Sequence, residues 1–177
     1  MEHPPTRVTA FIDASNLFHA QQQNGWKIDF AKLAKYIDSH GECRGKYYFT
    51  PTPSVFNQTA MLGYQKFKKM LIANGFTVKD KEVKAIKARD ATGQVVTKLK
   101  GNLDLEMGHW MTRVYPHYDT AIIMAGDGDY APILEDMVLN GKYVIVVSNR
   151  SNTAIEVQNI AQKFVDLHSL KPHIEFI

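Results

Sequence analysis

The chain has 177 residues, of which 45% are hydrophobic and 22% charged, and it carries a net charge of +3. These values are typical of a soluble globular protein of one domain, and the mild positive charge allows a polyanionic partner without requiring one. The single cysteine, Cys43, excludes an internal disulfide, and no apolar run approaches the roughly 18 residues that span a bilayer. Residues 1–5 lack the features of a signal peptide, so we expect a cytoplasmic protein that does not bind membranes.

The N-terminal part of the chain alternates strand and helix signals. The apolar run from Val8 to Ile12 predicts a buried strand, because a parallel strand covered on both faces reads as a continuous apolar stretch. Asp29 is placed to cap a helix, and Asn74-Gly75 is a typical helix end. The predicted elements are a strand over 7–13, helices over 15–23 and 29–39, a strand over 46–50 and a helix from about 55 to 73.

Residues 79–100 differ from the segments around them. Short β signals flank a turn at 90–93, and seven lysine or arginine residues stand against three acidic ones. We therefore expect a basic β-hairpin inserted into the domain. Its lysines either protect the edge of a ribbon or contact a phosphate backbone.

Beyond residue 100 the alternation resumes. Thr153 and Glu156 match a capping box at the start of the last helix. The predicted elements are a helix over 102–113, a strand over 118–125, a helix over 130–140, a strand over 143–148, a helix from 153 to about 162 and a short strand over 164–167. Alternating strands and helices form βαβ units, so the whole chain, 1–177, is predicted to be a single α/β domain with a central, mostly parallel sheet.

Four aspartates stand where such a sheet would gather them. Asp13 ends the first strand, Asp104 opens a helix, and Asp127 and Asp129 follow the strand over 118–125. In open α/β sheets, ligand sites form outside the carboxyl ends of the strands. Carboxylates that converge there repel one another unless a cation lies between them, and hard oxygen ligands select Mg²⁺ or Mn²⁺. The pattern predicts metal-dependent phosphoester chemistry.

Three of these aspartates also have a simpler structural explanation, which for Asp13 is a turn at the end of the strand or a cap on the next helix. Asp129 is placed to cap the helix that opens at Tyr130, and Asp104 suits the first turn of a helix, where the dipole favours acidic residues. Capping does not explain two aspartates in Gly126-Asp127-Gly128-Asp129, because their repulsion is a cost. The same glycines match a dinucleotide fingerprint, which we reject because aspartates would face the pyrophosphate. Glu106 is expected to be a solvated helix residue.

Three motifs, in this order, carry a resemblance to a known family. They are Phe11-Ile12-Asp13-Ala14-Ser15-Asn16, Lys100-Gly101-Asn102-Leu103-Asp104 and Ala125-Gly126-Asp127-Gly128-Asp129-Tyr130. From about residue 7 to 167 the chain resembles the NYN domain, the PIN-like group that includes the LabA and DUF88 proteins. The resemblance implies a Rossmann-like, PIN-type three-layer fold. It also implies a ribonuclease site dependent on Mg²⁺ or Mn²⁺ at the carboxyl edge of the sheet.

The resemblance implies a set of site residues. The catalytic carboxylates and metal ligands would be those of Asp13, Asp104, Asp127 and Asp129. Polar and basic neighbours are expected to bind the substrate, namely Ser15, Asn16, Lys98, Lys100 and Arg113. The expected partner is single-stranded RNA in the cytoplasm, and a homodimer is one option for the oligomeric state.

One departure from the family keeps other functions open. Members often carry a further aspartate later in the helix that Asp104 opens, where this chain reads Gly108-His109-Trp110. The loss could leave a single-metal site. It favours, as the alternative to a ribonuclease, a non-catalytic RNA-binding or regulatory module with a degenerate site. A metal-dependent phosphatase for small molecules is the third hypothesis, although a covalent phosphatase would need an aspartate in place of Ser15.

Overall fold

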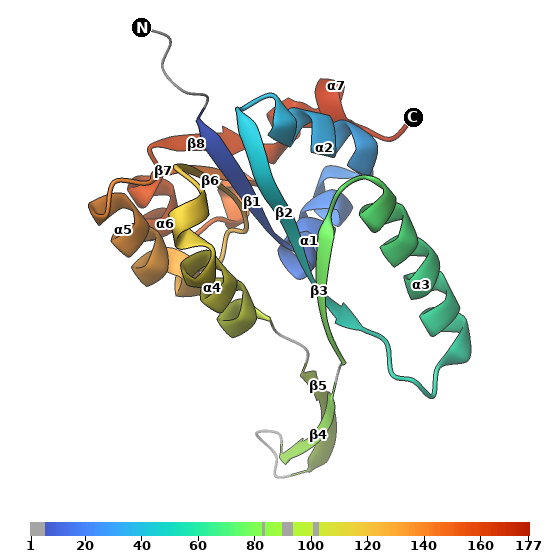
Figure 1. The fold of residues 1–177 in the computed structure, drawn as a ribbon. Helices are drawn as coiled ribbons and strands as arrows, with labels where there is room; N and C mark the ends of the chain where they lie inside the picture. Colours follow the sequence, from blue (N-terminus) through green and yellow to red (C-terminus); the bar gives the residue numbers. More distant parts are fainter. Residues whose placement is uncertain (1–5, 83, 90–93, 101–102) are drawn as a thin grey trace, which may run out of the picture.

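A computed structural model describes residues 6–82, 84–89, 94–100 and 103–177 of the chain (Figure 1). Its central sheet has six strands in the order β3-β2-β1-β6-β7-β8, and every neighbouring pair is parallel. The strands are β1 (Arg7–Asp13), β2 (Glu42–Thr52), β3 (Thr77–Glu82), β6 (Thr120–Met124), β7 (Tyr143–Ser148) and β8 (Lys163–Asp166). The predicted parallel sheet is therefore confirmed.

Helices cover both faces of this sheet. The first face carries α1 (Ala14–Asn24), α2 (Phe30–Asp38), α3 (Gln58–Ala73) and the short α7 (Lys171–Ile174). The second carries α4 (Asp104–Arg113), α5 (Ala131–Leu139) and α6 (Ile155–Ile160). Successive side chains of a strand point to opposite faces, so in β1 Ile12 joins the first core and Phe11 the second. This arrangement is the three-layer α/β fold predicted from the sequence.

The position of β1 at the centre of the sheet creates the place for a site. β1 pairs with β2 on one side and with β6 on the other. The chain thus passes from β1 to β2 in one direction and later crosses back to β6 in the other. At such a reversal of strand order the loops at the carboxyl ends diverge and leave a crevice. Asp13 and the turn after β6 lie at this point.

The basic insertion begins later than predicted. Residues 77–82 form β3, which pairs parallel with β2 at the edge of the central sheet. The separate ribbon consists only of β4 (Lys84–Arg89) and β5 (Val95–Lys100), paired antiparallel. Lys79 and Lys81 therefore belong to the edge strand. The predicted turn at 90–93 lies outside the described residues.

Local helix signals were mostly reliable. The Asp29 carboxylate accepts hydrogen bonds from the N–H groups of Ala31 and Lys32, as a helix cap should. The capping box at Thr153 was wrong: its hydroxyl donates to the carbonyl of Asn149, 2.8 Å away, and no side chain caps α6. Among the described residues, no helix is both long and apolar enough to cross a membrane.

Candidate functional site

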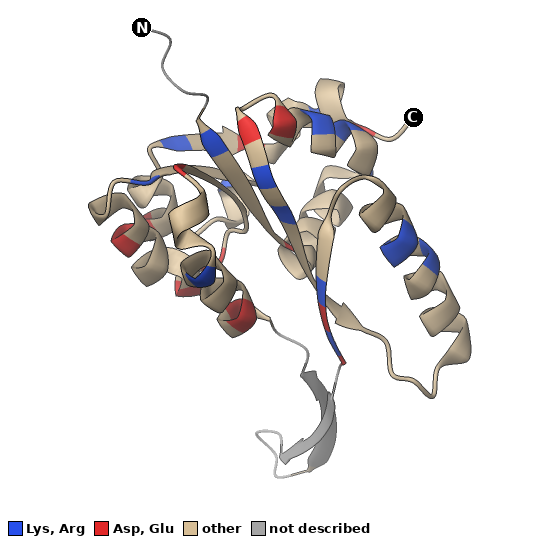
Figure 2. Cartoon of the chain, viewed as in Figure 1, with Lys and Arg blue, Asp and Glu red and all other residues tan. Residues whose placement is uncertain are grey.

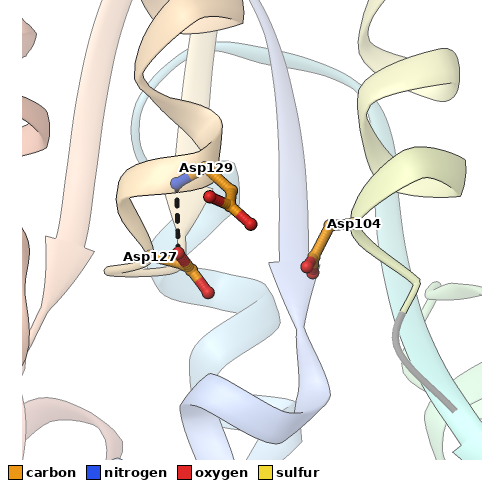
Figure 3. A group of neighbouring side chains, drawn as sticks. All are labelled: Asp104, Asp127 and Asp129. Carbon is orange, nitrogen blue, oxygen red and sulfur yellow. Dashed lines mark hydrogen bonds between the residues drawn. The ribbon is translucent and has the colours of Figure 1, made fainter. Parts of the chain in front are cut away.

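Three carboxylates meet at the carboxyl edge of the sheet (Figure 3). Asp104 opens α4, whereas Asp127 and Asp129 lie in the turn between β6 and α5. One oxygen from each residue lies within 4.8 Å of the other two. Asp104 is half-buried and the other two are exposed. Asp104 thus forms one oxygen cluster with two aspartates that lie more than 20 positions later, as their places in the sequence predicted.

The turn after β6 is organised by Asp127 rather than Asp129. The carboxylate of Asp127 accepts a hydrogen bond from the backbone N–H of Asp129, 3.0 Å away. It thereby caps the short 3₁₀ helix Gly128–Tyr130 that leads into α5. One of the two aspartates is thus a cap, as expected, but the alternative in which Asp129 is that residue is wrong. Asp129 lies two residues after the cap position, inside the first turn of the helix, whereas a cap precedes that turn.

Asp13 lies next to the three carboxylates but outside their group. It caps α1, because its carboxylate accepts bonds from the N–H groups of Ser15 at 2.8 Å and Asn16 at 3.2 Å. The Asn16 amide donates a third bond at 2.7 Å. Burial raises the pKa of the Asp13 carboxyl, while these bonds from Asn16 and Ser15 act in the opposite direction and the charge of Asp104 adds to the increase. Asp13 thus lies at the expected edge of the sheet, but it does not belong to the group of oxygens within 4.8 Å of one another.

Tyr130 connects Asp13 to the cluster. Its buried hydroxyl lies 2.8 Å from Asp104 Oδ1 and 3.4 Å from Asp13 Oδ2. Burial, together with these carboxylates, raises the pKa of the tyrosine, so the hydroxyl stays protonated. Sequence reasoning assigned no role to Tyr130, although it directly follows Asp129. A buried tyrosine needs a partner for its hydroxyl, and this need, together with the place of Tyr130 in the third motif, could have pointed to it.

Asn16 joins the ends of β1 and β6. Its amide nitrogen donates to Asp13, and its amide oxygen accepts from the N–H of Gly126 at 3.2 Å. Beside it lies a cavity of about 450 Å³ whose described lining holds no aspartate, glutamate, lysine or arginine. The predicted substrate-binding residues Ser15 and Asn16 line this cavity. Other polar side chains of its lining include Gln23, Ser148, Asn149 and Asn152.

Of the predicted basic residues, only Arg113 has a described side chain, and it does not lie beside the carboxylates. Arg113 ends α4, nine residues after Asp104, which corresponds to about 13 Å along a helix. Its guanidinium lies 5.0 Å from the ring centre of Trp110. This position does not bring it to a phosphate held by Asp104. Lys98 and Lys100 belong to β5, and their side chains lie outside the described part of the structure. Glu106, which was expected to be solvated, is half-buried, pairs with Lys81 and does not belong to the cluster.

Comparison with known proteins agrees with this site and fold. The chain is 28% identical to the low amplitude and bright protein LabA of Synechococcus elongatus, over 99% of this chain and 91% of that protein. The crystal structure of a protein of unknown function from Vibrio parahaemolyticus has the same fold, with a TM-score of 0.74. The two sequences are 18% identical, and the superposition covers 93% of this chain and 94% of the Vibrio protein. The model of the NYN domain, a PIN-like nuclease domain, matches residues 7–169, so the chain belongs to the NYN domain family.

Proposed function

We propose that the protein is a metal-dependent ribonuclease that hydrolyses phosphodiester bonds of single-stranded RNA at the carboxyl edge of its sheet. The observation that carries the proposal is the convergence of Asp104, Asp127 and Asp129, whose oxygens lie within 4.8 Å of one another. Membership of a nuclease family points in the same direction. Like charges at this spacing are costly unless a cation shares them.

The residues of the cluster suit Mg²⁺ or Mn²⁺. Its ligands are all carboxylate oxygens, and the group contains no histidine or cysteine among the described residues, as would be expected for zinc. Two oxygens that bind Mg²⁺ at about 2.1 Å lie at most about 4.2 Å apart. Small side-chain rotations of the two exposed aspartates would close the remaining difference.

In the proposed mechanism, Asp104, Asp127 and Asp129 would hold the ion. The ion, when bound, supplies an acidified water and neutralises charge on the scissile phosphate. The chain contributes the geometry. Asp127 is held by its bond to the Asp129 N–H, and the Tyr130 hydroxyl holds Asp104. Asp13 is oriented by Asn16 and helps to position Tyr130 through the longer contact.

The uncharged cavity beside Asn16 supports RNA as the substrate. Amide and hydroxyl groups such as those of Gln23, Asn152 and Ser148 can bond to ribose hydroxyls and to base edges. The ribose 2′-hydroxyl is the group by which a protein distinguishes RNA from DNA. We infer that a nucleotide next to the scissile bond occupies this polar cavity.

The proposal can be tested with purified protein and three labelled substrates. These are single-stranded RNA, single-stranded DNA and a generic phosphomonoester, each with Mn²⁺, with Mg²⁺ and with a chelator. We expect metal-dependent cleavage of RNA. Asp127→Asn should lower the rate at least about 100-fold, because the ion and its water are lost together. Glu106→Gln is the matched control, because it also replaces a carboxylate by an amide. Glu106 lies in α4 and pairs with Lys81, so this change should have little effect on the rate.

The outcomes separate the three hypotheses. Ribonuclease activity that survives in an Asp13→Asn/Asp127→Asn double variant would belong to a contaminant. RNA binding without cleavage by the unaltered protein would support a non-catalytic module. Preferred hydrolysis of the phosphomonoester would identify a phosphatase.

A further inference from the structure

We propose that an apolar cavity on the face of the sheet covered by α1 and α3 binds a nucleobase of the RNA strand, beside the scissile phosphate. The inference rests on the proposed function, because it assumes that RNA lies along the carboxyl edge of the sheet. The cavity has a volume of about 940 Å³ and lies between α1, α3 and the end of β2. Small-molecule sites have volumes of about 300–1,000 Å³, so a nucleoside fits with room to spare.

The cavity begins close to the catalytic edge. Thr50 and Pro51 line it, and they follow Phe49, the residue of β2 that pairs with Asp13. Neighbouring strands lie about 4.8 Å apart, so this wall is about one strand spacing from the end of β1. Ser15 also lines the cavity, and its N–H donates to the Asp13 carboxylate. A strand that crosses the carboxylates can therefore place a neighbouring nucleotide here.

Aromatic rings dominate the wall of the cavity. They come from α1, α2, β2, α3 and the loops beside them, as follows: Phe18, Trp26, Phe30, Tyr48, Phe67 and Phe176. Four are core residues or pack on the core, but Phe18 is 55% exposed and Phe176 is 64% exposed. Two exposed phenylalanines on one cavity form a surface on which a planar base can stack, as bases do in sites for single strands.

Polar groups of the wall suit the edge of a base. The exposed side chains of His19 and Gln22 line the cavity, and both can donate and accept hydrogen bonds. The indole Nε1 of Trp26 is buried without a hydrogen-bond partner in the described structure. A buried indole N–H usually has an acceptor, which a base carbonyl or ring nitrogen would supply.

The charge of the wall favours a base of an anionic strand over other ligands. No carboxylate lines the cavity, and Lys27 is its one lysine or arginine among the described residues. An apolar, neutral interior excludes a bare phosphate or an acidic peptide as the main occupant, because a buried charge would have no partner. Lys27 is exposed and suits the phosphate of the same nucleotide.

Binding is measured by fluorescence anisotropy of a labelled single-stranded oligoribonucleotide, in chelator, so that no cleavage occurs. Phe18→Ala should weaken binding about 5- to 150-fold, the effect of losing one stacked base. Phe176→Ala, on a different element, should also weaken it. Ile72→Ala is the matched control, because Ile72 is likewise a 55% exposed apolar helix residue but does not line the cavity. Thermal melting verifies that each variant is folded.

An abasic scan links Phe18 to one base. Removing the base at the bound position should weaken binding by the unaltered protein, and Phe18→Ala should then cause no further loss. Free nucleoside monophosphates should compete only weakly with the strand. If they bind more tightly than the strand, the cavity serves a free nucleotide, and the proposal is wrong.

Equal RNA binding by Phe18→Ala, Phe176→Ala and Ile72→Ala would also overturn the proposal. Because the measurement needs neither metal nor turnover, it is independent of the cleavage test. A protein that binds RNA through Phe18 and cleaves nothing would keep the base site and lose the ribonuclease function. If the protein cleaves RNA with metal but Phe18→Ala leaves RNA binding unchanged, the ribonuclease function stands and the base site is wrong.

Discussion

The four aspartates of the motifs have different tasks, although they are the same residue type. The carboxylate oxygens of three of them, Asp104, Asp127 and Asp129, lie close together. The carboxylate of Asp13 instead accepts hydrogen bonds from the first turn of α1 and from the Asn16 side chain. The difference arises from burial. Asp13 ends a strand that is covered on both faces, so its carboxylate needs several donors to remain there. Tyr130 supplies a weak contact to it and a strong one to Asp104.

Tyr130→Phe tests this connection. Hydrogen bonds to charged groups contribute about 1.5–3 kcal/mol, so we expect the variant to lose up to about that much stability in chelator. Without the hydroxyl, the carboxylates repel more strongly, and the increase in melting temperature on adding Mn²⁺ should be larger than in the unaltered protein. Tyr118→Phe is the matched control, because this buried hydroxyl donates to the carbonyl of Met111 instead of a carboxylate. Equal Mn²⁺ effects in both variants would contradict a link between Tyr130 and the metal.

At the scale of elements, the turn from β6 to α5 is the most constrained part of the site. A Cβ at Gly126 would lie 2.8 Å from Ser148 Oγ and 3.2 Å from Thr153 Cα. The segment after β7 therefore lies in close contact with the turn at Gly126, and only a residue without a Cβ leaves room for it. Because Asp127 directly follows Gly126, the packing of these two loops constrains the backbone that carries a predicted ligand.

Two glycine-to-alanine changes should have opposite effects on unfolding by urea. Gly126→Ala should destabilise the protein by about 1–3 kcal/mol through overcrowding. Gly63→Ala should stabilise it by about 0.5–1 kcal/mol, because Gly63 lies inside α3 with nothing within 4 Å of an added Cβ. Gly126→Ala should also reduce the stabilisation by Mn²⁺, and Gly63→Ala should leave it unchanged. If Gly126→Ala keeps full stability and metal response, the turn is less crowded than the distances indicate.

At the scale of the whole molecule, positive and negative charge are unevenly distributed (Figure 2). Lysines and arginines outnumber acidic residues along β2, α2 and α3, whereas acidic residues outnumber basic ones in α4 and α5. The ribbon of β4 and β5 adds five more lysine or arginine residues. Such an excess would guide an RNA backbone toward a cluster of carboxylates that would otherwise repel it.

The salt dependence of RNA binding tests the role of the ribbon. Each lost contact with single-stranded phosphate lowers the slope of log K against log salt by about 0.7. Lys84→Ala with Lys87→Ala should therefore flatten the slope by about 1.4. Lys35→Ala with Lys163→Ala is the control, because it removes the same charge from exposed positions in α2 and β8. If the ribbon variant has the slope of the control, the lysines protect an edge and do not contact RNA.

The sequence by itself determined the layers, the order of the elements and the approximate location of the site. Continuous apolar runs identify buried parallel strands, and a cap such as Asp29 acts through neighbours two or three residues away. These signals are local, so they can be read without knowing the fold. The three ordered motifs extended them to a family, because strand-end and helix-start positions meet at one edge of any such sheet.

Only the tertiary structure decided which groups meet there. The contact between Tyr130 and Asp13 spans 117 positions, and the bond from Gly126 to Asn16 spans 110. No local pattern encodes them. Likewise, the β signals of residues 77–82 are the same whether they pair with β2 or with a hairpin partner, because a strand pattern does not name its neighbour. The aromatic cavity, assembled from α1, β2 and α3, depends on the same long-range packing, and so it could be recognised only after the chain was folded.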